Sequence, residues 1–204
     1  MTSADWDNQL LVRMRSGEEA AFVELYRKLQ PSIYRFALHM TGSRSVAEDV
    51  TQETFLALIG DDFGYLPERG TLAGYLFGVA RKLVLRYLER MQNGPERGFD
   101  SAESGRQERT PAASFSDPVA GLIEREGLEE LRRAVVSLPR RYREVVVLCD
   151  LQEIDYADAA SLLGCPVGTV RSRLHRARAL LLDKLQRREP RYRVRSLTAA
   201  GSLI

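Results

Sequence analysis

The sequence predicts an all-α protein made of two small helical modules joined by a flexible linker. Apolar residues recur at helical spacing on both sides of residues 92–116. Residues 92–116 are instead rich in polar, Gly, Pro and Ser residues and have no apolar period, which is typical of a linker. A chain of 204 residues with 44% hydrophobic content can bury one sizeable core or two small ones, and the linker favours two.

Charge is distributed unevenly along the chain, although the formal net charge is only +2. Residues 45–68 hold six acids and no Lys or Arg, whereas residues 167–188 hold seven Lys or Arg and one acid. This asymmetry predicts one surface for a basic partner and another for an acidic partner such as a nucleic acid.

The first helices of the N-terminal module are predicted from caps and periodicity. Ser16 and Glu19 have the spacing of a capping box, and an apolar stripe then runs to a stop signal at Gly42. Because Pro31 interrupts this stripe, we expect either a helix pair or one helix kinked at Pro31.

A second capping box, Ser45 and Glu48, predicts a helix over about residues 46–59. Its polar face carries Asp49, Gln52 and Glu53. These acids are compatible with an ordinary solvated helix N-terminus, which favours negative charge, or with a docking surface.

Residues 60–70 read as an irregular loop, and Thr71 can cap the helix that follows. The inward stripe of that helix is expected to be Leu72, Leu76, Val79, Leu83, Tyr87 and Met91. Its outward basic residues are Arg81, Lys82, Arg86 and Arg90. After the linker, Pro118 opens a helix expected to reach about residue 137, and Pro139 starts another.

Residues 155–182 have the outline of a helix-turn-helix. Asp155 is a good N-cap for a helix over residues 156–163, Gly164 supplies a left-handed stop, and Pro166 precedes the next helix. The buried stripe of the second helix is predicted to be Val170, Leu174, Ala177 and Leu181.

The second helix presents a concentrated positive face that suits the DNA major groove. The candidates for contacts to base edges are Thr169, Arg171, Ser172 and His175. Candidates for phosphate contacts or pairs within the helix are Arg173, Arg176 and Arg178.

The sequence favours a binding protein over an enzyme. No paired carboxylates, nucleophile–base pair or Gly-rich phosphate loop occurs at motif spacing, so we expect no catalytic residues and no cofactor. Cys149 and Cys165 share no metal-ligand spacing with His39 or His175, so no metal site is expected and both thiols are read as reduced, in a cytoplasmic protein. No apolar run approaches the roughly 18 residues of a membrane span.

Two sequence strings resemble a known family. Residues 138–146, LPRRYREVV, and residues 168–178, GTVRSRLHRAR, closely resemble region 4 of bacterial sigma factors, and the likeness is strongest to the extracytoplasmic-function (ECF) class of the sigma-70 family. Residues 47–55, AEDVTQETF, look like the region 2.2 helix of the same family.

The resemblance implies a sigma factor that binds RNA polymerase core and directs transcription initiation at promoters. Region 4 would read the minus 35 element. The residues implied to dock on the β′ coiled coil of the polymerase are Glu48, Asp49, Gln52, Glu53 and Phe55. The residues implied to read and open the minus 10 element are Phe63, Tyr65, Tyr75, Arg81, Lys82, Arg86 and Arg90.

Some positions depart from the family pattern. Tyr75 stands where Trp is common, Lys82 where Asn is common, and Arg86 where an acid is common, so the minus 10 sequence that this chain reads is not fixed by the resemblance. The three aromatic residues, Phe63, Tyr65 and Tyr75, are open to a second interpretation as core residues rather than stacking platforms for bases.

The resulting division of the chain is region 2 over residues 1–91, a linker over 92–116, region 4 over 117–186 and a tail over 187–204. Expected partners are RNA polymerase core, through its β′ coiled coil and β flap, and promoter DNA, with an anti-sigma factor as a further candidate. Two alternatives stay open: a stand-alone helix-turn-helix regulator, and a helical adaptor or anti-sigma-type interaction protein.

Overall fold

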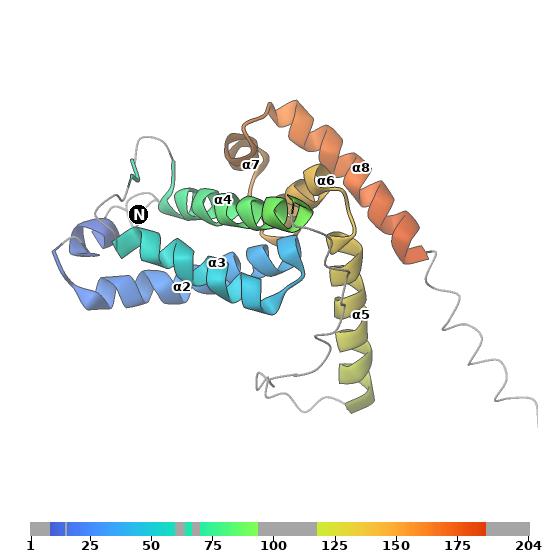
Figure 1. Ribbon diagram of the computed structural model, residues 1–204, viewed down its shortest axis with the longest axis horizontal. Helices are drawn as coiled ribbons and strands as arrows, with labels where there is room; N and C mark the ends of the chain where they lie inside the picture. The colour runs from blue at the N-terminus through green and yellow to red at the C-terminus, as the bar shows by residue number, and fades with distance from the viewer. Residues whose placement is uncertain (1–8, 15, 60–63, 67–69, 94–117, 187–204) are drawn as a thin grey trace, which may run out of the picture.

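The computed structural model describes residues 9–14, 16–59, 64–66, 70–93 and 118–186. Within these ranges the chain is helical, without strands, as predicted. The helices are α2 (Glu19–Thr41), α3 (Arg44–Ile59), α4 (Leu72–Asn93), α5 (Pro118–Val136), α6 (Arg140–Val145), η2 (Val146–Leu151), α7 (Tyr156–Leu163) and α8 (Val167–Gln186), and residues 9–14 form a short helix before them (Figure 1). None of the described helices is long and apolar enough to cross a membrane.

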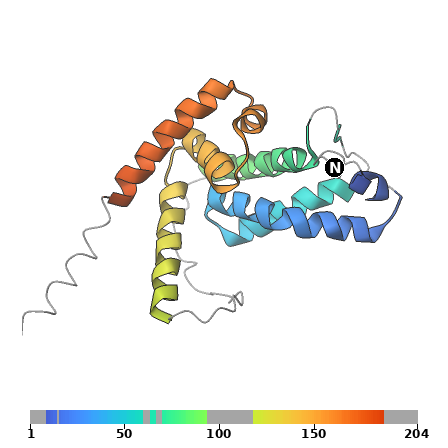
Figure 2. The same ribbon diagram turned by 180° about the vertical axis from the view of Figure 1, so that it is seen from behind.

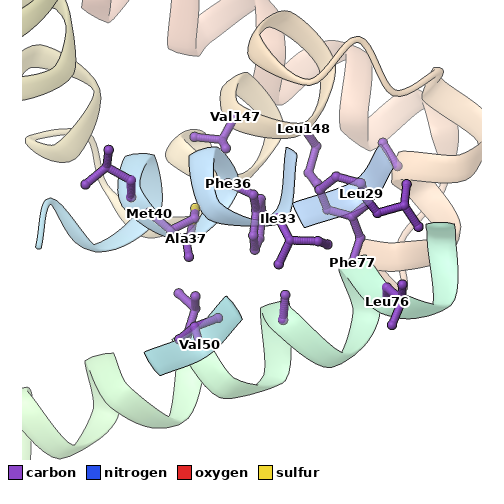
Figure 3. Close-up of a cluster of buried hydrophobic side chains, with 14 of the residues drawn as sticks. Leu29, Ile33, Phe36, Ala37, Met40, Val50, Leu76, Phe77, Val147 and Leu148 are labelled. Atoms are coloured by element: carbon purple, nitrogen blue, oxygen red, sulfur yellow. The ribbon is translucent and has the colours of Figure 1, made fainter. Parts of the chain in front are cut away.

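The N-terminal module is a bundle of α2, α3 and α4. The three helices pack pairwise and share one core, in which Phe36 of α2 meets Phe77 of α4 edge to face at 5.7 Å between ring centroids (Figure 3). Ile33 and Phe36 are fully buried, and Val50 of α3 is buried with them. This core fixes the direction in which the outer faces of α3 and α4 point.

The structure corrects the two predicted capping boxes. The Ser16 hydroxyl donates to the carbonyl of Arg13, and α2 begins at Glu19 without a side-chain cap. At α3 the capping hydroxyl belongs to Ser43, which accepts a hydrogen bond from the amide of Val46 at 3.4 Å, so Ser45 lies inside the helix. The predicted boxes fail because the Ser16 hydroxyl is taken by Arg13 and because Ser43, two residues before Ser45, supplies the cap of α3.

The sequence left open a helix pair or one helix kinked at Pro31, and in the structure α2 is a single helix with Pro31 inside it. Gly42 ends α2 in the left-handed conformation, with φ of 75°, as predicted. The N–H of Gly42 donates to the carbonyl of Leu38 at 2.8 Å, which completes the last turn.

The inward stripe of α4 is partly different from the prediction. Leu72 and Leu76 are buried as expected, but Met91 is 65% exposed and Val79, Leu83 and Tyr87 are only half-buried. The residues that complete the buried stripe are Phe77, Ala80 and Val84. The stripe is displaced because α4 packs on two sides, against α2 and α3 and against α7. Thr71 caps α4 as predicted, since its hydroxyl accepts from the amide of Gly74 at 3.1 Å.

The C-terminal module contains α5 to α8. Pro118 is the first residue of α5, as predicted, whereas its expected N-cap Asp117 lies outside the described residues. Pro139 precedes α6, which continues directly into the π-helix η2. Val145 to Leu148 are buried along this junction, so α6 and η2 form the support against which α8 packs.

The two modules contact each other. α5 and η2 touch α2, and α7 lies beside α4, as both views of the ribbon show (Figures 1 and 2). Val147 and Leu148 of η2 are buried near Leu29 and Phe36 of α2 (Figure 3). Sequence patterns do not indicate this contact between η2 and α2, because Leu29 and Phe36 are more than a hundred positions from Val147 and Leu148.

Candidate functional site

The helix-turn-helix has the local geometry that its sequence predicts. A carboxylate oxygen of Asp155 accepts hydrogen bonds from the amides of Ala157 and Asp158, both at 2.8 Å, and α7 covers the predicted residues. Gly164 is left-handed with φ of 63°, and the carbonyl of Pro166 accepts from the amide of Thr169 at 2.8 Å to start α8. The turn therefore holds the N-terminal end of α8 in one orientation relative to α7.

The buried stripe of α8 contains the four predicted residues, Val170, Leu174, Ala177 and Leu181. The opposite face is free of core contacts, and its exposed candidates for DNA binding are Arg171, Ser172, His175, Arg176 and Arg178. The two remaining candidates, Thr169 and Arg173, are half-buried. The first two turns of α8 thus offer hydroxyl, imidazole and guanidinium groups at one surface, which are the groups that read base edges and phosphates.

Two of the candidate arginines lie against tyrosines. The guanidinium of Arg171 is 5.8 Å from the ring centroid of Tyr156, at the start of α7. Arg176 hydrogen-bonds Tyr142 of α6, and this bond lowers the pKa of Tyr142, with the nearby Arg141 adding to the effect. Both contacts restrict long side chains before any ligand arrives, which reduces the entropy lost on binding.

Arg178 has a strong partner within the protein. Its Nε and Nη2 donate to the two carboxylate oxygens of Asp150 in η2, at 3.0 and 2.6 Å. This bidentate pair raises the pKa of Arg178. The sequence indicated a phosphate contact or a pair within the helix for Arg178. In the structure Arg178 instead ties α8 to η2, so a phosphate contact requires it to leave or share Asp150.

The basic helix α4 exposes three of its four predicted residues, Lys82, Arg86 and Arg90. The fourth, Arg81, is half-buried and donates from Nε to the carboxylate of Glu144 in α6 at 2.9 Å. Arg81 was expected to contact DNA, and its pairing with Glu144 is not indicated by any local pattern of the sequence.

The two described aromatic candidates for minus 10 binding, Tyr65 and Tyr75, are packed against each other. Tyr65 is 6% exposed, its hydroxyl donates to the carbonyl of Gly70 at 3.0 Å, and its ring meets that of Tyr75 edge to face at 5.7 Å. Tyr75 is half-buried. Of the two interpretations of these residues, the structure favours the core for Tyr65, because a stacked base needs an accessible ring face. Phe63 lies outside the described residues.

A shallow groove lies between α2 and α3, and two of the docking candidates of α3, Glu48 and Gln52, line it. Glu48, Asp49, Gln52 and Glu53 are exposed, whereas Phe55 is 3% exposed and forms the floor. Six of the residues that line the groove are Phe22, Tyr26, Tyr34, Glu48, Gln52 and Leu56.

Sequence reasoning missed the α2 wall of this groove. Phe22 and Tyr26 pack on Phe55 with ring centroids 6.4 and 4.7 Å apart, and Tyr26 is still 40% exposed. The signal that could have found this wall is a second stripe at spacing of four residues, Phe22 to Tyr26, beside the buried stripe of Ala21 and Leu25. A groove with an aromatic wall and Glu48 in its lining, on the helix that also exposes Asp49 and Glu53, suits a helical partner that carries apolar and basic side chains.

The part of the chain that the structure describes contains no group of three or more His, Cys, Asp or Glu side chains arranged to hold a metal ion. Both cysteines are free thiols. Burial, and next the charge of Asp150, raise the pKa of the Cys149 thiol to about 11, so this thiol stays protonated at neutral pH and is a poor nucleophile.

Comparison with known protein families supports both halves of the chain. Residues 25–93 match the model of Sigma-70 region 2, and residues 128–181 match that of Sigma-70, region 4. These ranges contain the basic helix α4, the helix-turn-helix and all the groove-lining residues except Phe22. Two solved structures are similar in fold. The structure of CnrH in complex with the cytosolic domain of CnrY has a TM-score of 0.64 and 24% identity, and the match covers 90% of this chain and 99% of that one. The structure of the sigma factor RpoE in complex with the anti-sigma factor NepR from Bartonella quintana has a TM-score of 0.58 and 22% identity, and the match covers 81% of this chain and 96% of that one.

Curated relatives match over most of the chain. The ECF RNA polymerase sigma factor SigE of Mycolicibacterium smegmatis is 34% identical over 83% of this chain, which spans 65% of the length of that relative. SigC of Mycobacterium tuberculosis is 31% identical over 85% of this chain and 89% of its own length, and the sigma-E factor of Salmonella typhimurium is 30% identical over 88% and 94%. Because both regions match in order and two relatives at 30% identity or more are covered over 89% and 94% of their length, the chain belongs to the ECF sigma factors of the sigma-70 family, the subunits that direct RNA polymerase to promoters.

Proposed function

We propose that this protein binds RNA polymerase core through the groove between α2 and α3, reads the minus 35 element with α8 and captures the minus 10 element with α4. One observation carries the proposal: a capped helix-turn-helix with an exposed basic reading face occurs in the same chain as an acidic groove and a second exposed basic helix. A stand-alone regulator needs the first of these but gives no role to the other two.

For the minus 35 element, the proposal assigns base contacts to Thr169, Arg171, Ser172 and His175, at the N-terminal end of α8. In helix-turn-helix proteins this end enters the major groove, while flanking cations hold the phosphates. Arg173 and Arg176 are assigned to phosphates, and Arg178 joins them only where it leaves or shares Asp150.

For the minus 10 element, the proposal assigns the phosphates of the displaced strand to Lys82, Arg86 and Arg90, with Arg81 joining them once it is released from Glu144. Single-strand binding needs cations along the backbone and an aromatic face or pocket for bases. Tyr75 is the described aromatic nearest to that role. Tyr65 stays a candidate only if its ring leaves Tyr75 and its hydroxyl leaves Gly70. Phe63, outside the described residues, stays a candidate.

Docking on polymerase is assigned to Glu48 and Gln52, which line the groove over Phe55, together with the exposed acids Asp49 and Glu53 of the same helix. The aromatic wall contributed by Phe22 and Tyr26 adds apolar area next to these charges. Exposed charges of this kind set association rate and specificity, while the buried aromatic area contributes most of the affinity.

The division of labour follows from this assignment. The N-terminal module, residues 1–91, would carry core binding and minus 10 capture, and the C-terminal module, residues 117–186, would carry minus 35 recognition. The linker, residues 92–116, would tether the two modules. The protein would act in the cytoplasm, where RNA polymerase works. The tail over residues 187–204 has no assigned role. An anti-sigma factor is a further proposed partner, since the structural relative RpoE was solved with NepR.

The decisive experiment is reconstituted transcription. The purified chain is mixed with RNA polymerase core and a library of promoter fragments, and transcripts are mapped. The proposal expects co-purification with core and initiation at a defined set of promoters. Binding to DNA without binding to core would support the stand-alone regulator instead, and binding to neither would support the adaptor.

A further inference from the structure

Three side chains of α8 form one stripe along its exposed face. Arg171, His175 and Arg178 follow one another at intervals of four and three residues, which places them on the same side of a helix over a length of about 10 Å. All three are exposed. Arg178 therefore faces the same way as Arg171 and His175, the two members of the stripe that are assigned to bases, and it lies about two turns further along α8 than Arg171.

Asp150 of η2 holds Arg178 by one edge of its guanidinium. The two carboxylate oxygens accept from Nε and Nη2 of Arg178 at 3.0 and 2.6 Å. A guanidinium carries five N–H donors in a fixed plane, so this pair leaves the edge formed by Nη1 and the second hydrogen of Nη2 to other acceptors. The side chain of Arg178 is 54% exposed and that of Asp150 is 26% exposed. The arginine is thus the accessible member of the pair.

Tyr156 of α7 adds a second restraint on the same stripe. Its hydroxyl hydrogen-bonds Arg178, and the guanidinium of Arg171 lies 5.8 Å from its ring centroid. Side chains from η2, α7 and α8 therefore form one connected cluster. A long side chain that is restrained before DNA arrives loses less conformational freedom when DNA binds.

We propose that Asp150 is a positioning residue for DNA recognition, which holds the guanidinium of Arg178 by one edge so that the other edge meets a pair of acceptor atoms on minus 35 DNA. Those acceptors are either two oxygens of a phosphate or the O6 and N7 atoms of a guanine, since both pairs match the planar edge of a guanidinium. Asp150 itself does not touch DNA. This role depends on the proposed function of α8 as the reader of the minus 35 element.

An acid behind an arginine has two opposite effects on DNA binding. The carboxylate repels phosphates, but across the length of the guanidinium, in water and salt, this repulsion changes affinity by less than about twofold. Loss of the restraint has a larger effect, because immobilising a long side chain on binding lowers affinity by roughly three- to tenfold. Removal of the acid should therefore weaken DNA binding, although the protein becomes more positive.

The test compares Asp150→Asn, Arg178→Gln and the variant that carries both changes. Asn keeps the size of Asp but presents an amide donor where Arg178 needs an acceptor. The matched control is Glu153→Gln, which removes an equal charge from an exposed residue between η2 and α7. Each full-length protein is bound to RNA polymerase core. Fluorescence anisotropy then measures the affinity of the holoenzyme, at several salt concentrations, for a labelled fragment of a promoter mapped by reconstituted transcription.

We expect Asp150→Asn to lower affinity roughly three- to tenfold and Glu153→Gln to change it by less than about twofold. Arg178→Gln should lower affinity further, and Asp150→Asn should cause no additional loss in that background, because Asp150 acts through Arg178.

The salt dependence of binding separates the contact from its positioning. If the acceptor is a phosphate, Arg178→Gln should reduce the slope of log affinity against log salt by about 0.9, whereas Asp150→Asn should not reduce it. If the acceptor is a guanine, Arg178→Gln should leave the slope unchanged, and its effect should disappear on fragments in which one G·C pair of the element is replaced.

Three results would overturn the proposal. A gain in affinity for Asp150→Asn would show that the carboxylate competes with DNA, and unchanged affinity for Arg178→Gln would show that Arg178 makes no contact. Equal losses with equal salt slopes for Asp150→Asn and Arg178→Gln would show that the pair only ties α8 to η2.

Circular dichroism checks that the variants keep their helix content. If Asp150→Asn misfolds, Arg178→Lys decides, since it keeps the charge but has no second edge: affinity should fall while the salt slope is retained, and full affinity would contradict the proposal. Failure of the proposed function is a different observation, namely an unmodified holoenzyme that initiates at no promoter or binds equally well when the minus 35 element is scrambled.

Discussion

Arg143→Met is the substitution whose effect on stability the structure defines best. Arg143 is a half-buried side chain of α6 that donates hydrogen bonds to three backbone carbonyls, those of Met40, Val136 and Leu138. Two of these carbonyls lie at the ends of α2 and α5, where backbone oxygens have no partner within their own helix. Met fills similar volume but donates nothing, so all three carbonyls lose this donor.

The change in the free energy of unfolding caused by Arg143→Met is the balance of two opposing contributions. Hydrogen bonds from a charged donor contribute about 1.5–3 kcal/mol each, which gives an upper bound of roughly 4.5–9 kcal/mol for three. The substitution also removes a guanidinium that is costly to bury and whose Nε has no acceptor in the described structure, which returns a few kcal/mol. We therefore expect a net loss of about 2–4 kcal/mol in the free energy of unfolding.

Urea unfolding followed by circular dichroism measures this loss. Arg133→Met is the matched control, because Arg133 is an exposed residue in the last turn of α5 and should change the free energy of unfolding by less than about 0.5 kcal/mol. Arg143→Lys should recover little, since a single ammonium group cannot reproduce the planar fork that reaches three carbonyls. If Arg143→Met unfolded at the same urea concentration as the control, the three hydrogen bonds would not be a source of stability and the reasoning would fail.

Three further predictions concern DNA, polymerase and pH. Arg171→Ala and Arg176→Ala should both weaken binding to minus 35 DNA. Loss of a base contact should cost about 1–3 kcal/mol of binding free energy and relax specificity, whereas loss of a phosphate contact should weaken binding to all sequences alike. Unchanged affinity in gel-shift titrations of both folded variants would refute the assignment of α8. Reversal of two charges, Asp49→Lys with Glu53→Lys, should abolish co-purification with core polymerase while circular dichroism stays unchanged, because like charges would then face the partner; retention of core binding at moderate salt would place the docking surface elsewhere. Burial, with the charges of Arg132 and Arg35 adding to it, lowers the pKa of His39 from its usual 6.5, while its Nδ1–H donates to the carbonyl of Arg35 at 2.7 Å. Neutral His39 is therefore favoured in the folded state, so its contribution to stability is complete above about pH 6.5 and is lost as the pH falls through the lowered pKa; His39→Gln should flatten the dependence of urea midpoint on pH between 7 and about 5, and an equally steep dependence in that variant would assign the titration to another group.

Local signals in the sequence determined most of the helices and the recognition element. Each end of α7 follows from a local signal: Asp155 caps its start, and Gly164 ends it in the left-handed conformation. The buried stripe of α8 follows from periodicity alone, because an inward face must be apolar whatever it packs against. The acidic face of α3 and the basic face of α4 were likewise visible as charge patterns along single helices.

Tertiary structure alone decided which of these groups are free to act. Arg81 and Glu144 are 63 positions apart, and Arg143 and Met40 are 103 apart, so no periodicity or cap could indicate that they meet. The groove over Phe55 needs walls from two helices, and the position of the buried stripe of α4 depends on its being covered from two sides. A sequence specifies which faces are apolar or charged, but the pairing of one face with another depends on the relative placement of whole helices, which is set by the packing of the complete core.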